Sequence, residues 1–180
     1  MKKQIALIVG HEPGGGAEGE RVYNIAVRGH MVANLAAAGF DVFSYDHVLK
    51  SYGARQDAMR RAVMKAQPHN LICVELHYND VDTPLANGHQ FHYNASPGLA
   101  RAFADAWRFR FPASKPRQDN GIYHTPTGDG SGFLRKAPGL AVLTEPFFHS
   151  NPDENKFFAF KQKSVADTYC DAIKAFSSHL

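Results

Sequence analysis

Two histidines and two glutamates occupy positions at which a protein with a central sheet could gather them at one edge. His11 and His77 lie just after short apolar runs, Glu145 ends a third such run, and Glu20 follows a glycine-rich loop. Catalytic zinc binds three protein ligands from His, Glu or Asp and leaves a fourth position for water. Such a metal lowers the pKa of the water towards about 7 and polarises a carbonyl, and a separate carboxylate can move the water proton to a leaving nitrogen. The set could therefore perform metal-assisted hydrolysis, with His11, Glu20 and His77 as ligands and Glu145 as the base.

Glu75 adds a further carboxylate near the second histidine. It precedes His77 by two residues, so the two side chains share one face of the predicted strand. Glu75 could orient His77, replace a metal ligand, or be neutralised by Arg60 or Arg61. The residues alone leave these alternatives open.

Three further histidines are candidates for the site: His89, His92 and His124. His89 and His92 fall on opposite faces of a short strand, so they are not expected to bind one metal together. His124 lies in a long loop rich in Gly, Thr and Pro, from which it could contact substrate.

The segments that would position these residues alternate between strands and helices. Apolar runs rich in branched residues predict strands over 4–9, 40–45, 70–76, 89–93 and 139–144. Helical spacing and end signals predict helices from Glu20 to a stop at Gly39, over 51–67, from Ser96 to about Arg110, and from Asn151 towards the C-terminus. Residues 119–137 are expected to form a long functional loop.

Two of these helices have apolar stripes that predict their buried faces. In the first helix the stripe consists of Val22, Ile25, Ala26, Gly29, Val32, Leu35 and Ala36. In the last helix it consists of Phe158, Val165, Ala166, Tyr169, Ile173 and Phe176.

This alternation predicts an α/β fold. We expect a single domain over residues 1–180, with a mixed, mostly parallel twisted sheet and helices on both faces. In such folds, functional sites gather at the carboxyl ends of the strands. We therefore expect to find four residues at that edge: His11, Glu20, His77 and Glu145.

The composition narrows the class of protein. Of 180 residues, 44% are hydrophobic and 21% charged, as in a folded globular domain, and we expect no membrane insertion because no apolar run approaches about 20 residues. The apolar run over 5–9 is shorter than the roughly 7 residues of the shortest signal-peptide cores, so the chain is expected to be cytoplasmic as synthesised. Cys73 and Cys170 lie in apolar segments and are expected to be buried thiols.

Charge gives a weaker indication. The net charge of +3 mildly favours anionic partners. The alternation of aromatic and basic residues over 107–111 is better explained by core packing with solvated arginines than by nucleic-acid binding, so no nucleic-acid partner is expected. The oligomeric state is left open.

Four stretches resemble motifs of one enzyme family. They are Ile8-Val-Gly-His11 before a glycine-rich loop; Glu20-Arg-Val-Tyr-Asn-Ile-Ala26; Leu76-His77-Tyr78-Asn79 with Gly88-His-Gln-Phe-His-Tyr93; and Ala141-Val-Leu-Thr-Glu145-Pro-Phe-Phe148 with Ser150-Asn-Pro-Asp-Glu154. In this order they resemble the zinc-dependent N-acetylmuramoyl-L-alanine amidases of cell-wall remodelling enzymes and phage endolysins. The resemblance covers residues 5 to about 154.

The resemblance implies roles for particular residues. His11, Glu20 and His77 would bind one Zn²⁺ per chain, Glu145 would be the catalytic base, and Asn79 would contact substrate. Glu18 competes with Glu20 because the loop after His11 is shorter than usual, and the sequence that follows Glu20 favours Glu20. The Asp-Pro that usually precedes Gly-His is replaced by Ile8-Val9, which removes a carboxylate that would tune a metal-bound histidine.

The expected function is hydrolysis of the amide between N-acetylmuramic acid and L-alanine, with peptidoglycan as the partner. A lysin released to the periplasm or cell wall would fit the absence of an export signal. One alternative is a zinc hydrolase of the same fold that acts on a soluble N-acyl amino acid or peptide. Another is a wall-binding domain with a degenerate site, which the missing Asp before His11 motivates.

Overall fold

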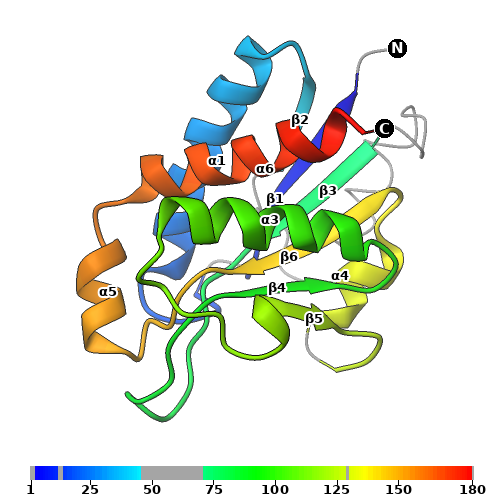
Figure 1. Cartoon of the computed structure of the whole chain (residues 1–180). Coiled ribbons are helices and arrows are strands. Elements are labelled where there is room, and N and C mark those ends of the chain that lie inside the picture. Colours follow the sequence, from blue (N-terminus) through cyan, green and yellow to red (C-terminus); the bar gives the residue numbers. More distant parts are fainter. Residues whose placement is uncertain (1–2, 12–13, 46–70, 129, 180) are drawn as a thin grey trace.

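The polypeptide folds around one six-stranded sheet in a computed structural model, which describes residues 3–11, 14–45, 71–128 and 130–179. The strands are β1 (Gln4–Val9), β2 (Asp41–Tyr45), β3 (Leu71–Leu76), β4 (Gln90–Tyr93), β5 (Ile122–His124) and β6 (Leu140–Glu145). Their order across the sheet is β2-β1-β3-β6-β4-β5 (Figure 1). All neighbouring pairs are parallel except β4 and β6, which run antiparallel. The mixed, mostly parallel α/β sheet expected from the sequence is confirmed.

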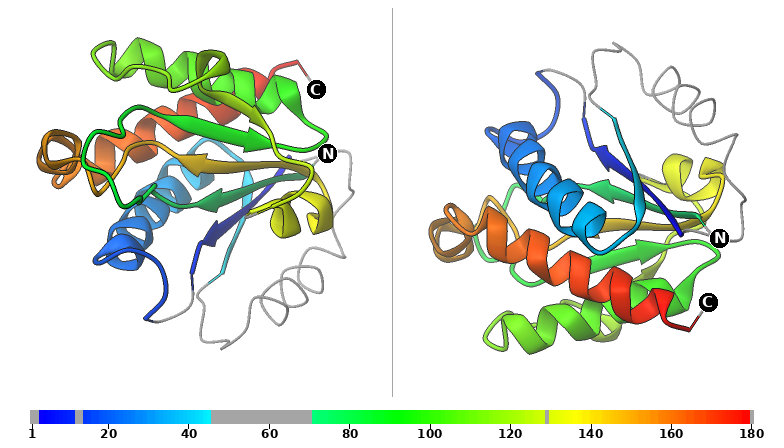
Figure 2. Two further views of the ribbon diagram at one scale, coloured as in Figure 1. Left: turned by 90° about the horizontal axis from the view of Figure 1, so that it is seen from below. Right: turned by 90° about the horizontal axis from the view of Figure 1, so that it is seen from above.

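Helices cover both faces of this sheet. The helices α1 (Glu20–Ala37), α3 (Pro97–Arg110) and α6 (Gln162–Ser177) lie together on one face, α4 (Ser131–Lys136) lies on the other, and α5 (Pro152–Phe158) lies at one end of the sheet (Figures 1 and 2). Strand β1 shows why two faces are needed. Its Ile5 and Leu7 join the large core with α1, α3 and α6, whereas Ala6 and Ile8 join the smaller core with α4.

The first helix begins where the chain turns out of the glycine-rich loop. Gly19 has a left-handed backbone (φ 75°), and α1 follows directly with Glu20. At the other end Gly39, also left-handed (φ 87°), ends the helix, as its sequence position predicted. The buried face was predicted only in part: Leu35 is buried and Val32 packs against the core as predicted, but Tyr23, Val27 and Met31 are buried too, and Val22 is 74% exposed.

The predicted stripe and the residues that are in fact buried both follow helical spacing. A tertiary contact therefore decides which face of α1 is buried. Glu20 is 2% exposed and points into the site at the sheet edge. That orientation brings Tyr23 against Phe147, at 5.4 Å between ring centroids, and places Val22 on the solvent side.

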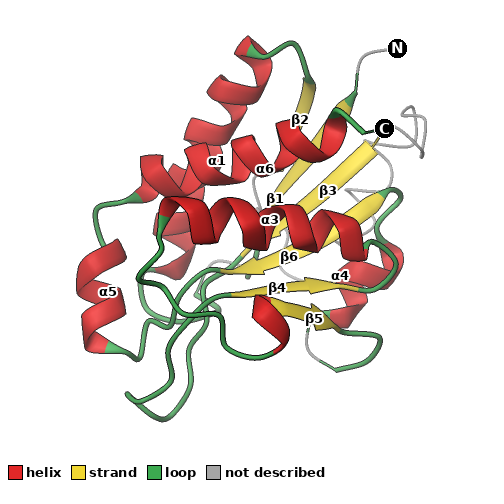
Figure 3. Cartoon of the chain, viewed as in Figure 1, coloured by secondary structure: helices red, strands yellow, loops and turns green. Residues whose placement is uncertain are grey.

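Two further expectations need correction. The segment 119–137 is not one loop: it contains a short 3-10 turn (Asp119–Gly121), β5 and α4 (Figure 3). The helix expected from Asn151 onwards is two helices, because α5 ends at Phe158 and α6 starts at Gln162. The predicted buried face of this region is confirmed: Phe158, Val165, Ala166, Tyr169 and Ile173 are buried, and Phe176 is partly buried against the same core.

The remaining expectations concern the two cysteines, the aromatic segment over 107–111 and the predicted helix over 51–67. Cys73 and Cys170 are free and buried. Trp107 is fully buried and Phe109 is 89% exposed, so only part of that aromatic segment packs in the core. The predicted helix over 51–67 lies outside the described residues, as do Arg60 and Arg61. None of the described helices is long and apolar enough to cross a bilayer.

Candidate active site

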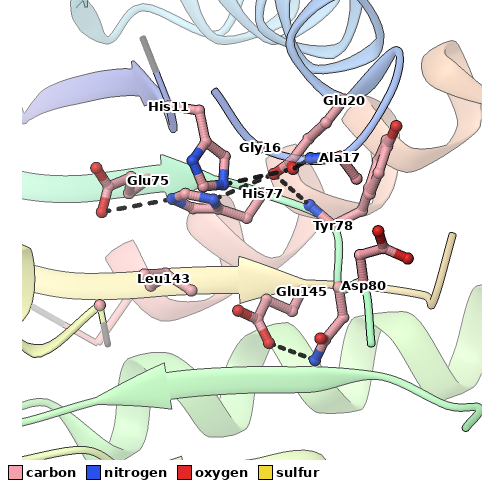
Figure 4. A pocket seen from close by; sticks show the side chains of 12 residues that line it. His11, Gly16, Ala17, Glu20, Glu75, His77, Tyr78, Asp80, Leu143 and Glu145 are labelled. Carbon is pink, nitrogen blue, oxygen red and sulfur yellow. Dashed lines mark hydrogen bonds and ion pairs between the residues drawn. The ribbon is translucent and has the colours of Figure 1, made fainter. Parts of the chain in front are cut away.

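Strands β1, β3 and β6 lie side by side and parallel, so the residues that end them reach the same edge of the sheet. A pocket of about 490 Å³ opens at this edge. His11, Glu20, Glu75, His77, Asn79 and Glu145 are among the residues that line it (Figure 4).

His11, Glu20 and His77 form a compact cluster in this pocket. Their ligand atoms all lie within 4.8 Å of one another. Glu20 lies between the imidazoles, with Oε2 at 3.4 Å from His11 Nε2 and Oε1 at 3.2 Å from His77 Nδ1. The structure therefore brings together the three candidate ligands named from the sequence.

The backbone fixes the carboxylate of Glu20. Its Oε2 accepts a hydrogen bond from the N–H of Ala17 at 3.1 Å, and its Oε1 accepts one from the N–H of Tyr78 at 3.2 Å. Glu18, the competing candidate, is exposed, and its backbone carbonyl accepts a hydrogen bond from the hydroxyl of Tyr78. The cluster thus selects Glu20 over Glu18.

Two glycines leave room for the imidazoles. A Cβ on Gly10 would lie 2.0 Å from Cε1 of His77, and a Cβ on Gly16 would lie 2.5 Å from Cδ2 of His11. His11 itself has φ 54°, a left-handed conformation that costs a non-glycine residue roughly 1–2 kcal/mol. Such strain is typical of functional sites, and here it accompanies the placement of His11 beside Glu20.

Glu75 lies on the far side of His77. Its Oε2 is 3.7 Å from His77 Nε2, the side chain is 2% exposed, and Oε2 has no hydrogen-bond partner among the described residues. Burial disfavours a charged His77, but the carboxylates of Glu20 and Glu75 outweigh this effect and raise its pKa to about 10. The geometry favours Glu75 as a group that orients His77 over Glu75 as a metal ligand, whereas the alternative with Arg60 or Arg61 lies outside the described residues.

The donor set fits a divalent transition metal. Two imidazole nitrogens and one carboxylate oxygen converge while one side of the pocket stays open, which is the ligand composition of catalytic zinc sites. A carboxylate behind a ligating histidine is also typical of such sites. Glu75 provides such a carboxylate for His77 from β3, on the strand next to Ile8 and Val9, which stand where the family usually has Asp-Pro.

Glu145 stands across the pocket from the cluster, at the end of β6 (Figure 4). Its Oε2 accepts a hydrogen bond from Asn79 Nδ2 at 2.7 Å and lies 3.3 Å from His92 Nε2. Burial raises the pKa of Glu145. The hydrogen bond from His92, together with the more distant His77 and His11, lowers the pKa by more than burial raises it, so the net shift is downwards. Glu145 is therefore an ionised carboxylate that can accept a proton.

The two residues expected to contact substrate lie in different places. Asn79 lines the pocket and donates its amide hydrogens to Glu145 and to Gln90 Oε1. His124 lies on β5 with its ring 5.3 Å from that of Tyr93, and it is not among the described residues that line the pocket.

Sequence reasoning missed the part that β4 plays in the site. Gln90 and His92 are two residues apart on β4, so their side chains lie on the same face of the strand. Because β4 runs antiparallel to β6 with Gln90 opposite Glu145, both side chains lie near Glu145 and Asn79. His92 was considered only as a metal ligand. The alternation was visible in the sequence, but the strand direction and the neighbouring strand were not.

Comparisons with known proteins agree with this geometry. A family model described as N-acetylmuramoyl-L-alanine amidase matches residues 5–175. A search of curated proteins found no match.

Solved structures of the same fold include the amidase AmiC2 of Nostoc punctiforme, at 20% identity and a TM-score of 0.81, with 98% of this chain and 97% of that chain covered. The catalytic domain of the amidase CwlV from Bacillus (Paenibacillus) polymyxa var. colistinus has 24% identity and a TM-score of 0.73, with 98% of each chain covered. The catalytic domain of the CD27L endolysin, which targets Clostridia difficile, has 18% identity and a TM-score of 0.76, with 96% of this chain and 97% of that chain covered. The chain belongs to the family of N-acetylmuramoyl-L-alanine amidases, the enzymes that cleave the amide bond between N-acetylmuramic acid and L-alanine in peptidoglycan.

Proposed function

We propose that this protein is a zinc-dependent amidase in which His11, Glu20 and His77 bind one Zn²⁺ and Glu145 is the catalytic base. The observation that supports this proposal is the convergence of the three ligand atoms within 4.8 Å, in the same pocket as an ionised Glu145. A bound zinc ion would supply the polarisation of the scissile carbonyl and the acidification of water.

The protein's own residues supply the rest of the reaction. Glu145 removes a proton from water as the water oxygen forms a bond to the lactyl carbonyl carbon of N-acetylmuramic acid. The same carboxyl group then delivers that proton to the nitrogen of L-alanine as the C–N bond breaks. The products are a free carboxylic acid on the sugar and a new amino terminus on the peptide.

The net charge of the chain and the position of the pocket fit a polymer substrate. The pocket lies at the carboxyl edge of the sheet rather than inside the domain. A net charge of +3 would favour approach to an anionic cell wall, in a manner that weakens with added salt. The shared fold with an endolysin catalytic domain supports a lytic role, and the catalytic unit would be the whole chain of 180 residues.

The test uses purified peptidoglycan and metal analysis. We expect about one zinc per chain, loss of that zinc in His77→Ala, and release of new L-alanine amino termini that stops with a chelator and resumes with added zinc. If the enzyme acts only on soluble N-acyl amino acids or peptides, its substrate is a small molecule and not peptidoglycan. Binding to walls by a metal-free protein that releases no amino termini would contradict an enzymatic role.

A further inference from the structure

The hydrogen bonds to Glu145 share one feature: both end on the same carboxylate oxygen. Asn79 Nδ2 lies 2.7 Å from Oε2, and His92 Nε2 lies 3.3 Å from the same atom. Among the described residues, no hydrogen bond is made to Oε1. The carboxylate therefore has one anchored oxygen and one that is available to the pocket.

His92 is itself held from two other sides. Its Nδ1 lies 2.8 Å from Oγ1 of Thr125, and its ring stacks on that of Tyr123 with 5.2 Å between centroids and 25° between planes. Thr125 is fixed in turn by a hydrogen bond from its backbone N–H to the carbonyl of Tyr93 at 2.8 Å. The side chain of His92 is only 17% exposed, so its ring is ordered by contacts that lie outside the metal cluster.

An ionised carboxylate can only accept hydrogen bonds, so the contact with Glu145 places an N–H on Nε2 of His92. On the other side of the ring, Nδ1 is held by the hydroxyl of Thr125. Asn79 donates one amide hydrogen to the same oxygen of Glu145 and the other to Gln90 Oε1 at 2.5 Å.

We propose that His92, with Thr125 behind it, is the positioning residue of the catalytic base: it anchors Oε2 of Glu145 so that Oε1 alone exchanges the proton. This inference rests on the proposed amidase function. Oε1 accepts the proton as the water oxygen bonds to the carbonyl carbon, and it releases the proton to the leaving nitrogen as the C–N bond breaks. His92 keeps its own proton throughout.

Several titratable groups face Glu145 besides His92, and they bear on the pH dependence. The other histidines that face it are His77 and His11, and the carboxylates in the same pocket belong to Glu20, Glu75 and Asp80. His92 is the one that contacts Glu145 directly. Its removal should raise the pKa of Glu145, whereas the metal cluster keeps its composition.

The kinetic test compares His92→Leu with His92→Gln on a soluble N-acetylmuramoyl-L-alanyl peptide. Loss of a hydrogen bond to a charged group predicts a kcat lower by about 10- to 100-fold in His92→Leu, with KM and zinc content unchanged. The acidic limb of the kcat profile should move to higher pH. His92→Gln retains an N–H donor and should recover part of kcat, and His30→Gln, at an exposed position on α1, should match the unmodified protein.

A second measurement separates this inference from the proposed function. In metal-free protein, a ¹³C NMR titration of the Glu145 carboxyl, assigned by its absence in Glu145→Gln, should show a higher midpoint in His92→Leu. If the unmodified protein releases no amino termini, the proposed function fails while this titration still tests the anchoring.

Thr125→Val is the variant of choice if His92→Leu does not fold, and it should lower kcat by about 3- to 10-fold. The inference is overturned if an active enzyme keeps its kcat, and Glu145 keeps its midpoint, when His92 is replaced by Leu or, in that case, Thr125 by Val.

Discussion

The two sides of the active-site pocket are held in different ways. On the metal side, backbone N–H groups of Ala17 and Tyr78 fix Glu20, and the absence of a Cβ at Gly10 and Gly16 makes room for the imidazoles. On the base side, the side chains of Asn79 and His92 fix Glu145. The ligand geometry thus depends on the path of the chain, whereas the orientation of the base depends on a few replaceable side chains.

The largest effect is expected from the base itself. Glu145→Gln removes the proton acceptor and should lower kcat by about 100- to 10,000-fold, while zinc content stays at the level of the unmodified protein. Steady-state kinetics and metal analysis on the same preparation check this. Loss of zinc in this variant would show that the two sides of the pocket are not separable.

The metal side should respond strongly to a single added methyl group. In Gly10→Ala the new Cβ would lie 2.0 Å from Cε1 of His77, so the imidazole must move and zinc affinity should fall by at least about 100-fold. The matched control is Gly29→Ala in α1, where a Cβ meets nothing within 4 Å and helix propensity predicts up to about 1 kcal/mol of added stability. Zinc competition titrations that find equal affinity in both variants would refute a steric role for Gly10.

Glu75 should have a smaller effect than the residues it supports. Glu75→Gln keeps the shape but removes the negative charge 3.7 Å from His77 Nε2, and loss of such a supporting carboxylate lowers metal affinity by about 10- to 100-fold. Competition with a chromophoric chelator measures the change. An unchanged affinity would leave Glu75 as a buried acid without influence on the metal.

The smallest effect concerns acid stability on the base side. His89, next to Gln90, is fully buried, its Nε2 has no hydrogen-bond partner among the described residues, and burial, together with the charge of Arg108, lowers its pKa to about 4. The unfolded chain, with a pKa near 6.5 for this group, therefore binds the proton first. Stability should fall below about pH 6.5, by about 2 kcal/mol between pH 7 and pH 5, and this contribution should level off below about pH 4.

Urea unfolding at pH 7 and pH 5 checks this last prediction. In His89→Asn, which removes the imidazole, the pH dependence should be weaker by that amount. An equal pH dependence in both proteins would assign the acid sensitivity to other groups.

The same contrast explains how much the sequence could predict. The metal side follows from local rules: short apolar runs end at His11 and His77, and Glu20 opens a helix, so the sheet edge gathers them. The mostly parallel sheet and the three proposed ligands were therefore within reach of sequence reasoning.

The base side depends on long-range pairing. Gln90 and His92 meet Glu145 only because β4 inserts between β6 and β5 with opposite direction to β6. No local pattern encodes that direction. Helical spacing also does not determine which face of α1 is buried, because that face depends on the burial of Glu20 in the site.

The loops that follow β3 and β6 have one further consequence for how the enzyme would be used. The N–H of Asn79 donates to the carbonyl of Phe147, the N–H of His149 donates to the carbonyl of Asn79, and Glu154 accepts hydrogen bonds from the N–H groups of Gly88 and Phe148. These bonds join the two loops through protein groups alone. The spacing between His77 and Glu145 should therefore survive the removal of a bound metal, and we expect an emptied enzyme to be refilled without refolding.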